Sequence, residues 1–277
     1  MAEESQQSQP ARPTLGLIGA GNMASAMVRG WVRADRTMGE RILVTDRGSG
    51  RAADLAERFD VRHVASNADL VREADVVVLC VKPIDVERVL REVSELVTVD
   101  KAIASVAAGV RTATLETILD VDAPVFRFMP NVGVQVGLGT LAYSSGRFIH
   151  TDAESAVLEA FQLLGEIVPL EERQFDAATA LSGSGPAFIA LLMEAFEDAG
   201  IVSGLTYADA RTLLLSTVIG TAGLLREEQM PCSVLRRMVT SPGGTAAAGL
   251  AELERQGVRG AIIDGVVAAM RRAGELG

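Results

Sequence analysis

The sequence LGLIGAGNMASAM at residues 15–27 decides the fold of this chain. It contains the motif Gly-x-Gly-x-x-Ala, formed by Gly19, Gly21 and Ala24. In such a motif the first glycine permits a tight turn, the second lets the backbone approach a pyrophosphate, and the small third residue brings a helix close to a strand. The N–H groups and positive dipole at the start of that helix favour an anion. The motif predicts a dinucleotide site, although its spacing alone also fits a plain tight turn.

Short apolar runs alternate with helical patterns through the first half of the chain. Strands are predicted at residues 14–18, 42–45, 61–64, 75–81, 102–107, 125–129, 137–142 and 165–169, and helices at 22–33, 51–59, 86–97, 114–119 and 152–164. This alternation predicts a mostly parallel sheet with helices on both faces. A fully apolar strand such as ADVVVLCV is expected where both faces are covered. Because Gly19 lies between the first strand and the first helix, the dinucleotide site is favoured over a plain turn.

The pattern changes after residue 171. From there the chain shows helices at 174–181, 186–199, 207–226, 232–239, 244–256 and 258–275, separated by stretches rich in Gly, Pro and Ser. The predicted fold class is therefore α/β, with an all-helical addition. We predict a disordered lead at 1–13, a Rossmann-like dinucleotide-binding domain at 14–171, and an all-helical domain at 172–277.

The composition excludes several classes of protein. A formal net charge of −10 argues against a nucleic-acid partner, because phosphate binding needs a basic face. No apolar run approaches the ~20 residues that cross a bilayer, and the polar start of the chain lacks the apolar stretch of a signal peptide. The two cysteines, Cys80 and Cys232, form neither a metal motif nor a disulfide framework. We therefore expect no metal, no membrane and a cytoplasmic location.

The end of the second predicted strand bears on the choice between NAD and NADP. Asp46 stands 27 residues after Gly19, near where an acidic residue holds the ribose hydroxyls of NAD. Arg47 follows directly and Arg51 is close, and a guanidinium here can hold the 2′-phosphate of NADP. Asp46 can also cap the following helix. We therefore predict NADP or NAD, in reduced form, without choosing. Lys82, after the fourth strand, fits both a cofactor contact and an exposed lysine.

The sequence offers no obvious acid or base for hydride-transfer chemistry. The two histidines, His63 and His150, have no acidic partner at a suggestive spacing and are more simply interpreted as structural or exposed. No lysine follows Lys101, so the helical half lacks the catalytic lysine that hydroxyacid dehydrogenases of similar layout carry there. Oxidation of an alcohol, which needs a proton acceptor, is therefore disfavoured.

Two segments rich in Gly and Ser begin helices in the second half. They are SGSGP at 182–186 and SPGGT at 241–245. Each would present hydroxyls and backbone N–H groups at a helix N-terminus, which suits a carboxylate. Each also fits simple helix punctuation.

From about residue 14 to its C-terminus, the chain resembles the pyrroline-5-carboxylate reductases, the last enzymes of proline synthesis. The resemblance rests on LGLIGAGNMASAM, VKP (81–83), VAAGV (106–110), RFMPN (127–131), ALSGSGPAF (180–188) and MVTSPGGTAAAGLAELE (238–254). It implies NAD(P)H-dependent reduction of a cyclic imine carboxylate to L-proline. It also implies a helical domain that forms an intertwined dimer, with decamers as a frequent further assembly. Because a cyclic imine is already electrophilic, positioning can supply much of the rate without a strong acid or base.

The resemblance also implies which residues touch the ligands. The expected cofactor contacts are Gly19, Ala20, Gly21, Asn22, Met23, Asp46, Asn67, Cys80, Val81, Lys82, Pro83, Val106, Ala107 and Ala108, to which the position after the second strand adds Arg47. The expected substrate contacts are Thr179, Ser241, Gly243, Gly244, Thr245 and Ala246, with Thr245 as the catalytic residue.

One position departs from the family pattern. The family continues Gly-Gly-x-Thr, with the threonine hydroxyl near the imine nitrogen, whereas Ala246 occupies that place here. Thr245 stands one residue earlier, ~100° around a regular helix, and one lost hydrogen bond costs about 1–2 kcal/mol. The proline that usually follows the MPN sequence is also absent, with Val132 there instead. Two alternatives therefore remain: a reductase of another cyclic imine, and a non-catalytic nucleotide-binding relative.

Overall fold

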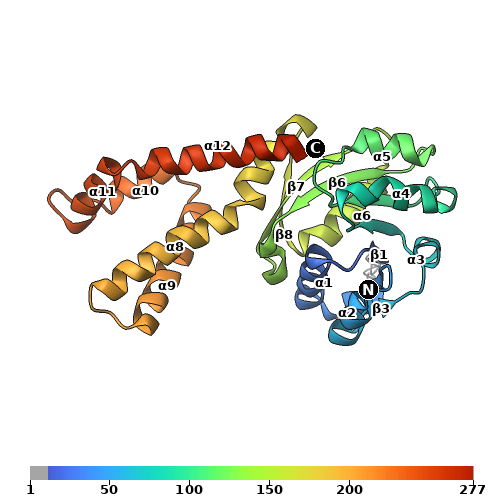
Figure 1. The fold of residues 1–277 in the computed structure, drawn as a ribbon, viewed down its shortest axis with the longest axis horizontal. Helices are drawn as coiled ribbons and strands as arrows, with labels where there is room; N and C mark the ends of the chain where they lie inside the picture. The colour runs from blue at the N-terminus through green and yellow to red at the C-terminus, as the bar shows by residue number, and fades with distance from the viewer. Residues whose placement is uncertain (1–11, 277) are drawn as a thin grey trace, which may run out of the picture. The chain divides into compact units, whose positions relative to one another are not determined.

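An eight-stranded sheet forms the N-terminal part of the molecule (Figure 1). The computed structural model describes residues 12–276, so the predicted lead at 1–13 lies almost wholly outside the described residues. The strands are β1 (Leu15–Ile18), β2 (Ile42–Thr45), β3 (Arg62–His63), β4 (Val76–Leu79), β5 (Ala102–Ser105), β6 (Val125–Pro130), β7 (Gly139–Ser145) and β8 (Gly165–Pro169). Their order is β3-β2-β1-β4-β5-β6-β7-β8. β1 to β6 are parallel, β7 is antiparallel to β6, and β8 is parallel to β7. The predicted Rossmann-like, mostly parallel sheet is confirmed.

Alternate residues of the strands β1, β2, β4, β5 and β6 contribute to two separate cores, one on each face of the sheet. Leu17 and Val78 pack in a core with α1, α2 and α6, whereas Ile18 and Val77 pack in a core with α3, α4 and α5. These helices are α1 (Asn22–Ala34), α2 (Arg51–Phe59), α3 (Asn67–Glu73), α4 (Pro83–Val93), α5 (Thr112–Leu119) and α6 (Thr151–Gln162). Burial of each such side chain contributes about 1.5–3 kcal/mol. Because the strands are packed on both faces, their carboxyl ends are held in fixed positions at the edge of the sheet.

The sequence patterns miss α3 and extend the third strand too far. α3 is seven residues long and buries Leu70 and Val71, which do not repeat at the helical spacing. Its signal is a cap instead, because the Ser66 hydroxyl accepts a hydrogen bond from the N–H of Asp69 at 3.1 Å. The strand predicted at 61–64 shrinks to Arg62–His63, which pairs with β2 at the edge of the sheet and is exposed.

The helix predicted at 174–181 is irregular. A short 3₁₀ turn, η4 (Glu172–Gln174), leads into α7 (Phe175–Ala178) and then into a π-helical turn, η5 (Thr179–Gly183). After a bend at Ser184, α8 (Gly185–Val202) begins. The Gly- and Ser-rich pattern predicts a helix start here, and α8 does begin at Gly185 with no side-chain cap, but a π turn that the pattern does not predict precedes it. Such turns insert one extra residue into a helix and are frequent at functional sites.

The described chain divides into two units, residues 12–183 with 270–276, and residues 184–269. The second contains α8, α9 (Tyr207–Glu227), α10 (Cys232–Met238), α11 (Thr245–Arg255) and most of α12 (Val258–Leu276). Within residues 184–269 only Ala210 and Leu235 are buried, whereas Phe196 and Ile219 are 62% and 70% exposed. Apolar helices without a core of their own need a partner surface. Across residues 12–276, none of the helices combines the length and apolarity that a membrane span requires.

Candidate active site

The turn after β1 can be made only by glycine at its first position. Gly19 has a φ of 103°, and a Cβ added there would lie 2.9 Å from the carbonyl oxygen of Cys80. The N–H of Gly19 donates to the carbonyl oxygen of Thr45 at 2.9 Å. The turn is therefore held between the ends of β2 and β4, and a side chain would both strain its backbone and collide with its neighbour.

The N-terminus of α1 faces open space. Gly21 is its N-cap, and within residues 12–276 no side chain caps this helix. A Cβ added to Gly21 would meet no described atom within 4 Å. The adjoining cavity, of about 130 Å³, is lined by Ala20, Gly21, Asn22, Ser25, Arg51, Asp54, Leu55 and Arg58. The uncapped N–H groups suit an anion such as a pyrophosphate, and the two arginines suit a further phosphate group.

Asp46 is occupied by its own loop. Its Oδ1 accepts hydrogen bonds from the N–H groups of Gly48 at 2.8 Å and Ser49 at 3.2 Å. Its Oδ2 accepts from the Ser49 hydroxyl at 2.6 Å and the Ala52 N–H at 3.0 Å. Burial acts to raise the pKa of Asp46, but these hydrogen bonds together hold it below its usual value. Of the two roles open for Asp46, the structure has the one that caps α2.

The arginines after β2 are not equivalent. Arg47 is ion-paired with Asp85 in the first turn of α4, and the hydrogen bond from Arg47 is the largest cause of the lowered pKa of Asp85. Arg51 and Arg58 line the cavity beside Gly21 instead. Sequence reasoning missed Arg58. The signal that could have found it is its spacing of two helical turns from Arg51, which places both on one face of α2.

The carboxyl ends of β1, β4 and β5 meet beside the glycine turn. The N–H of Cys80 donates to the carbonyl oxygen of Ile18 at 2.9 Å, and the N–H of Val106 donates to that of Leu79 at 3.1 Å. Burial raises the pKa of the Cys80 thiol, which therefore stays protonated and is no nucleophile. Lys82 is exposed directly before α4.

Three of the predicted cofactor segments, residues 19–23, 80–83 and 106–108, thus lie along one edge of the sheet. This is the edge at which open parallel sheets bind ligands. Asn67 is the first residue of α3, and its Nδ2 donates to Oε1 of Glu92 in α4 at 3.0 Å.

Thr179 is the first residue of the π turn. Its Oγ1 donates to the carbonyl oxygen of Phe175 at 2.7 Å. The turn is fastened to the loop after β6, because Nδ2 of Asn131 donates to the Ser182 hydroxyl at 3.2 Å. Oδ1 of Asn131 in turn accepts from the N–H of Thr140 at 3.2 Å. The asparagine of the RFMPN sequence therefore has a local structural role.

The second predicted helix start, SPGG, is present as predicted from its residues. Gly243 has a φ of 70°, and the N–H of Gly244 donates to the carbonyl oxygen of Ser241 at 3.0 Å. Gly244 is the N-cap of α11, and within the described chain no side chain caps that helix. Thr245 is exposed at its first position, and Ala246 is half-buried at its second. The segment presents backbone N–H groups and a hydroxyl to a ligand.

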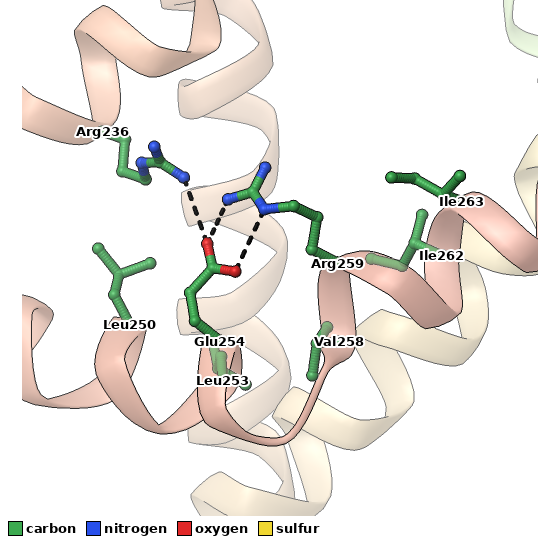
Figure 2. A pocket seen from close by; sticks show the side chains of 8 residues that line it. All are labelled: Arg236, Leu250, Leu253, Glu254, Val258, Arg259, Ile262 and Ile263. Carbon is green, nitrogen blue, oxygen red and sulfur yellow. Dashed lines mark hydrogen bonds and ion pairs between the residues drawn. The ribbon is translucent and has the colours of Figure 1, made fainter.

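A larger cavity, of about 390 Å³, lies between α10, α11 and α12 (Figure 2). Figure 2 shows Glu254 reaching the guanidinium groups of Arg236, at 3.7 Å, and Arg259. The remaining lining is aliphatic: Leu250, Leu253, Val258, Ile262 and Ile263. Glu254 stands nine residues from Thr245, roughly 13 Å along α11. An aliphatic lining at that distance suits a protein surface better than a small charged imine.

Two family models match the chain. Residues 172–276 match pyrroline-5-carboxylate reductase dimerisation, and residues 14–109 match NADP oxidoreductase coenzyme F420-dependent. The chain is 37% identical over 263 residues to a pyrroline-5-carboxylate reductase of Methanosarcina acetivorans, covering 95% of this chain and 97% of the relative. It is 39% identical over 263 residues to that of Glycine max, covering 95% and 96%.

Solved structures show the same likeness over the whole chain. A pyrroline-5-carboxylate reductase from Coxiella burnetii superposes with a TM-score of 0.86 at 33% identity, covering 96% of this chain and 99% of that one. A pyrroline carboxylate reductase from Plasmodium falciparum, with NADP bound, gives 0.85 at 28% identity, covering 96% and 98%. An imine reductase from Pseudomonas, with a TM-score of 0.53 at 16% identity, shares the fold alone. The resemblance predicted from the motifs is confirmed, and the chain belongs to the pyrroline-5-carboxylate reductase family of NAD(P)H-dependent oxidoreductases acting on C=N bonds.

Proposed function

We infer that this chain reduces pyrroline-5-carboxylate to L-proline with a reduced nicotinamide dinucleotide. The observation that carries this inference is the pair of helix N-termini at which the two motifs end, α1 after Gly21 and α11 after Gly244, each with a glycine N-cap and no side-chain cap. The first suits a pyrophosphate and the second suits a carboxylate. A reductase of an imine acid must bind both the pyrophosphate and the carboxylate. It needs no strong acid or base, because the imine is already electrophilic.

The cofactor contacts in this proposal follow the sheet edge. The pyrophosphate accepts from the N–H groups at the start of α1, beside Gly21. The other assigned contacts are Gly19, Ala20, Asn22, Met23, Asp46, Arg47, Asn67, Cys80, Val81, Lys82, Pro83, Val106, Ala107 and Ala108. When bound, the reduced nicotinamide supplies the hydride that forms the new C–H bond at the imine carbon. Asp46 and Arg47 have partners within the chain, so each would contact the cofactor only by sharing or exchanging them.

The substrate contacts follow the SPGG segment. The Ser241 hydroxyl and the free N–H groups of the first turn of α11 hold the carboxylate. Gly243 and Gly244 shape the backbone beside it, since the Gly244 N–H already donates to the Ser241 carbonyl oxygen. Thr245 supplies the hydroxyl that we assign to the imine nitrogen, in a less favourable position than that of Ala246, because the two residues lie ~100° apart around the helix. Thr179 is assigned as a further substrate contact. These groups bind and orient the imine. Binding and orientation are sufficient for reduction, because the C=N bond is already electrophilic.

We further propose that NADPH is used in preference to NADH. Both carboxylate oxygens of Asp46 already accept hydrogen bonds from Gly48, Ser49 and Ala52, so a bond to the ribose hydroxyls of NADH must be shared with these donors and is weakened. Arg51 and Arg58 line the cavity next to this loop and can hold a 2′-phosphate. The presence of NADP in the Plasmodium relative supports the same preference.

The preference can be tested by comparing kcat/KM for the two cofactors. Arg51→Gln with Arg58→Gln should lower the value for NADPH about tenfold to 100-fold, since bonds to charged groups contribute about 1.5–3 kcal/mol. The value for NADH should change less than about threefold. Arg91→Gln, which removes an exposed arginine paired with Glu87 on α4, is the control. Equal losses for both cofactors would contradict the assignment.

The assembly and the domain roles are also proposed. Residues 14–171 bind the dinucleotide, and residues 172–277 carry the substrate segment and form an intertwined dimer, with dimers joining into a decamer. The aliphatic cavity of α10–α12 and the exposed apolar side chains of residues 184–269 support self-association. The acidic chain is assigned no nucleic-acid partner, and we propose a cytoplasmic location. Light scattering across a concentration series tests the assembly.

Ala246 favours one alternative, a reductase for another cyclic imine. The deciding experiment is a panel of pyrroline-5-carboxylate and its six-membered homologue, each with NADPH, with the product identified by chromatography. Proline as the best product supports the proposal. A higher kcat/KM for the larger ring supports the alternative. Tight NADPH binding with no reduction of either imine would indicate a nucleotide-binding relative without catalysis.

A further inference from the structure

An ion pair between a buried arginine and a half-buried glutamate lies between two of the assigned binding segments in the first unit. Arg127 of β6 is 5% exposed and pairs with Glu172 of η4. Its guanidinium also lies over the ring of Phe175, 4.1 Å from the ring centre. Neither charge is used by the proposed function. A buried arginine is costly unless it is paired, so the placement of this pair is closely defined.

The second oxygen of Glu172 reaches the helix that follows the cofactor loop. Its Oε1 accepts hydrogen bonds from the N–H of Thr112 at 2.9 Å and from the Thr112 hydroxyl at 3.1 Å. Thr112 is the first residue of α5, and Arg111, the N-cap of that helix, separates it from the loop at 106–110. A carboxylate at this position is favoured by the helix dipole. Glu172 therefore anchors the end of the loop that carries Val106.

The other side of the pair reaches the π turn. Phe175, which is buried beneath the Arg127 guanidinium, accepts the hydrogen bond from the Thr179 hydroxyl through its carbonyl oxygen at 2.7 Å. Glu172, Arg127 and Phe175 thus link Thr112, two residues beyond the loop at 106–110, to Thr179.

We propose that Arg127 and Glu172 are positioning residues that hold the π turn bearing Thr179 in register with the cofactor loop before α5. The proposal rests on the proposed function, because it takes Thr179 as a substrate contact and residues 106–108 as cofactor contacts. Neither charged group touches a ligand. Their effect on the rate is indirect, since hydride transfer requires the imine carbon and the nicotinamide at a defined separation, and a misplacement of about 1 Å can cost roughly 100-fold.

The test separates positioning from simple loss of folded protein. In Arg127→Met, kcat/KM for the imine should fall at least about tenfold, while the Kd for NADPH stays within about twofold, because its phosphate contacts lie at α1 and α2. Rates are expressed per NADPH-binding site, so unfolded protein does not count. Arg127→Lys keeps the charge but not the planar fork, and should recover part of the loss. Arg91→Met, an exposed arginine on α4, should change neither constant.

A double-variant cycle provides the decisive reading. If Arg127 acts through the π turn, adding Arg127→Met to Thr179→Val should lower kcat/KM by no more than about threefold beyond the worse single variant. Independent, multiplying losses would overturn the proposal. Should Arg127→Met fail to fold, Glu172→Gln retains the shape, and an unchanged kcat/KM per NADPH site would overturn it equally. A wild-type chain that binds NADPH but reduces no imine contradicts the proposed function. An Arg127→Met protein whose kcat/KM per NADPH site equals that of the wild type contradicts only the positioning role.

Discussion

The helices α1 and α11 begin alike but are supported differently. Each has a glycine at its N-cap, Gly21 or Gly244, and neither has an acidic residue in its first turn. α1 is packed on the sheet through fully buried side chains such as Met27 and Trp31. α11 buries no residue within the described chain. The helix start proposed to bind an anion is therefore preorganised by the chain's own core in one unit, and in the other it depends, in the proposed assembly, on a second subunit.

Because of this difference, substitutions in the two units should affect different properties of the protein. A change at the start of α1 can remove a ligand contact while the fold stays intact. A change in residues 184–269 acts on assembly as well as on the substrate segment, because those residues have almost no core of their own.

The largest effect is expected at Gly21. Gly21→Val should lower the affinity for NADPH at least about 100-fold, a loss of about 2.7 kcal/mol, because the side chain would fill the space above α1. The thermal midpoint should hardly change, since a Cβ there meets no described atom within 4 Å. Fluorescence titration and a melting curve measure the two quantities. Gly19→Val is the contrasting variant and should lose stability too, because of its φ of 103°. A Gly21→Val protein with normal affinity would refute the placement of the pyrophosphate.

The next effect concerns assembly. Ile219 of α9 and Ile84 of α4 are both strongly exposed in the chain, at 70% and 88%. Ile219→Glu should dissociate the oligomer and destabilise residues 184–269, because it would bury a charge against a partner at a cost of several kcal/mol. Ile84→Glu should leave the mass unchanged, since the first unit has its own core. Light scattering with thermal melts distinguishes the two, and an unchanged mass for Ile219→Glu would contradict the contrast.

A smaller gain is expected at the start of α11. Ala246→Thr should raise kcat/KM for pyrroline-5-carboxylate about tenfold, because a hydroxyl on the imine nitrogen contributes about 1–2 kcal/mol. The Kd for NADPH should stay the same, since that contact belongs to the other unit. Ala246→Val, of similar shape without the hydroxyl, is the matched control. Equal activity of wild type and Ala246→Thr would show that Thr245 already supplies the bond.

The smallest effect concerns Asp46. Asp46→Asn should destabilise the protein by about 1 kcal/mol at neutral pH, because an amide nitrogen cannot accept from Ser49 and Ala52. The folded pKa of Asp46 is depressed, since its hydrogen bonds outweigh burial. Its stabilisation is therefore present above the unfolded pKa near about 3.9 and is lost as pH falls through the lower folded pKa. Urea unfolding at pH 7 and in acid should show the gap between wild type and variant closing. A constant gap would contradict this origin.

Much of the fold could be predicted from the sequence, because the signals are local. The glycine turn at Gly19, the apolar run of β4 and the helix at Arg51–Phe59 follow from backbone limits and burial on both faces of a sheet. The helix α3 was not predicted, because its signal in the sequence is the Ser66 cap rather than an apolar repeat. The π turn at Thr179–Gly183 was not predicted, because glycine and serine indicate that a regular helix is interrupted but not which type of turn replaces it.

The candidate site was less predictable, because side-chain partners decide it. Whether Asp46 meets a ribose or caps a helix depends on hydrogen bonds from Ser49 and Ala52, and spacing cannot choose between them. Arg47 is occupied by Asp85 from a helix far along the chain. The Arg127–Glu172 pair joins residues 45 positions apart, and only the folded sheet brings them together.

The scarcity of lysine offers a way to measure cofactor binding at the edge of the sheet where the assigned cofactor segments lie. The chain has two lysines, and Lys101 donates from Nζ to the carbonyl oxygen of Ala74 at 2.8 Å, whereas Lys82 is exposed beside the segment assigned to the cofactor. Among the side chains, an amine-reactive dye should therefore label mainly Lys82. Bound dinucleotide should slow that acylation, so that occupancy of the site could be read by peptide mass spectrometry without any turnover.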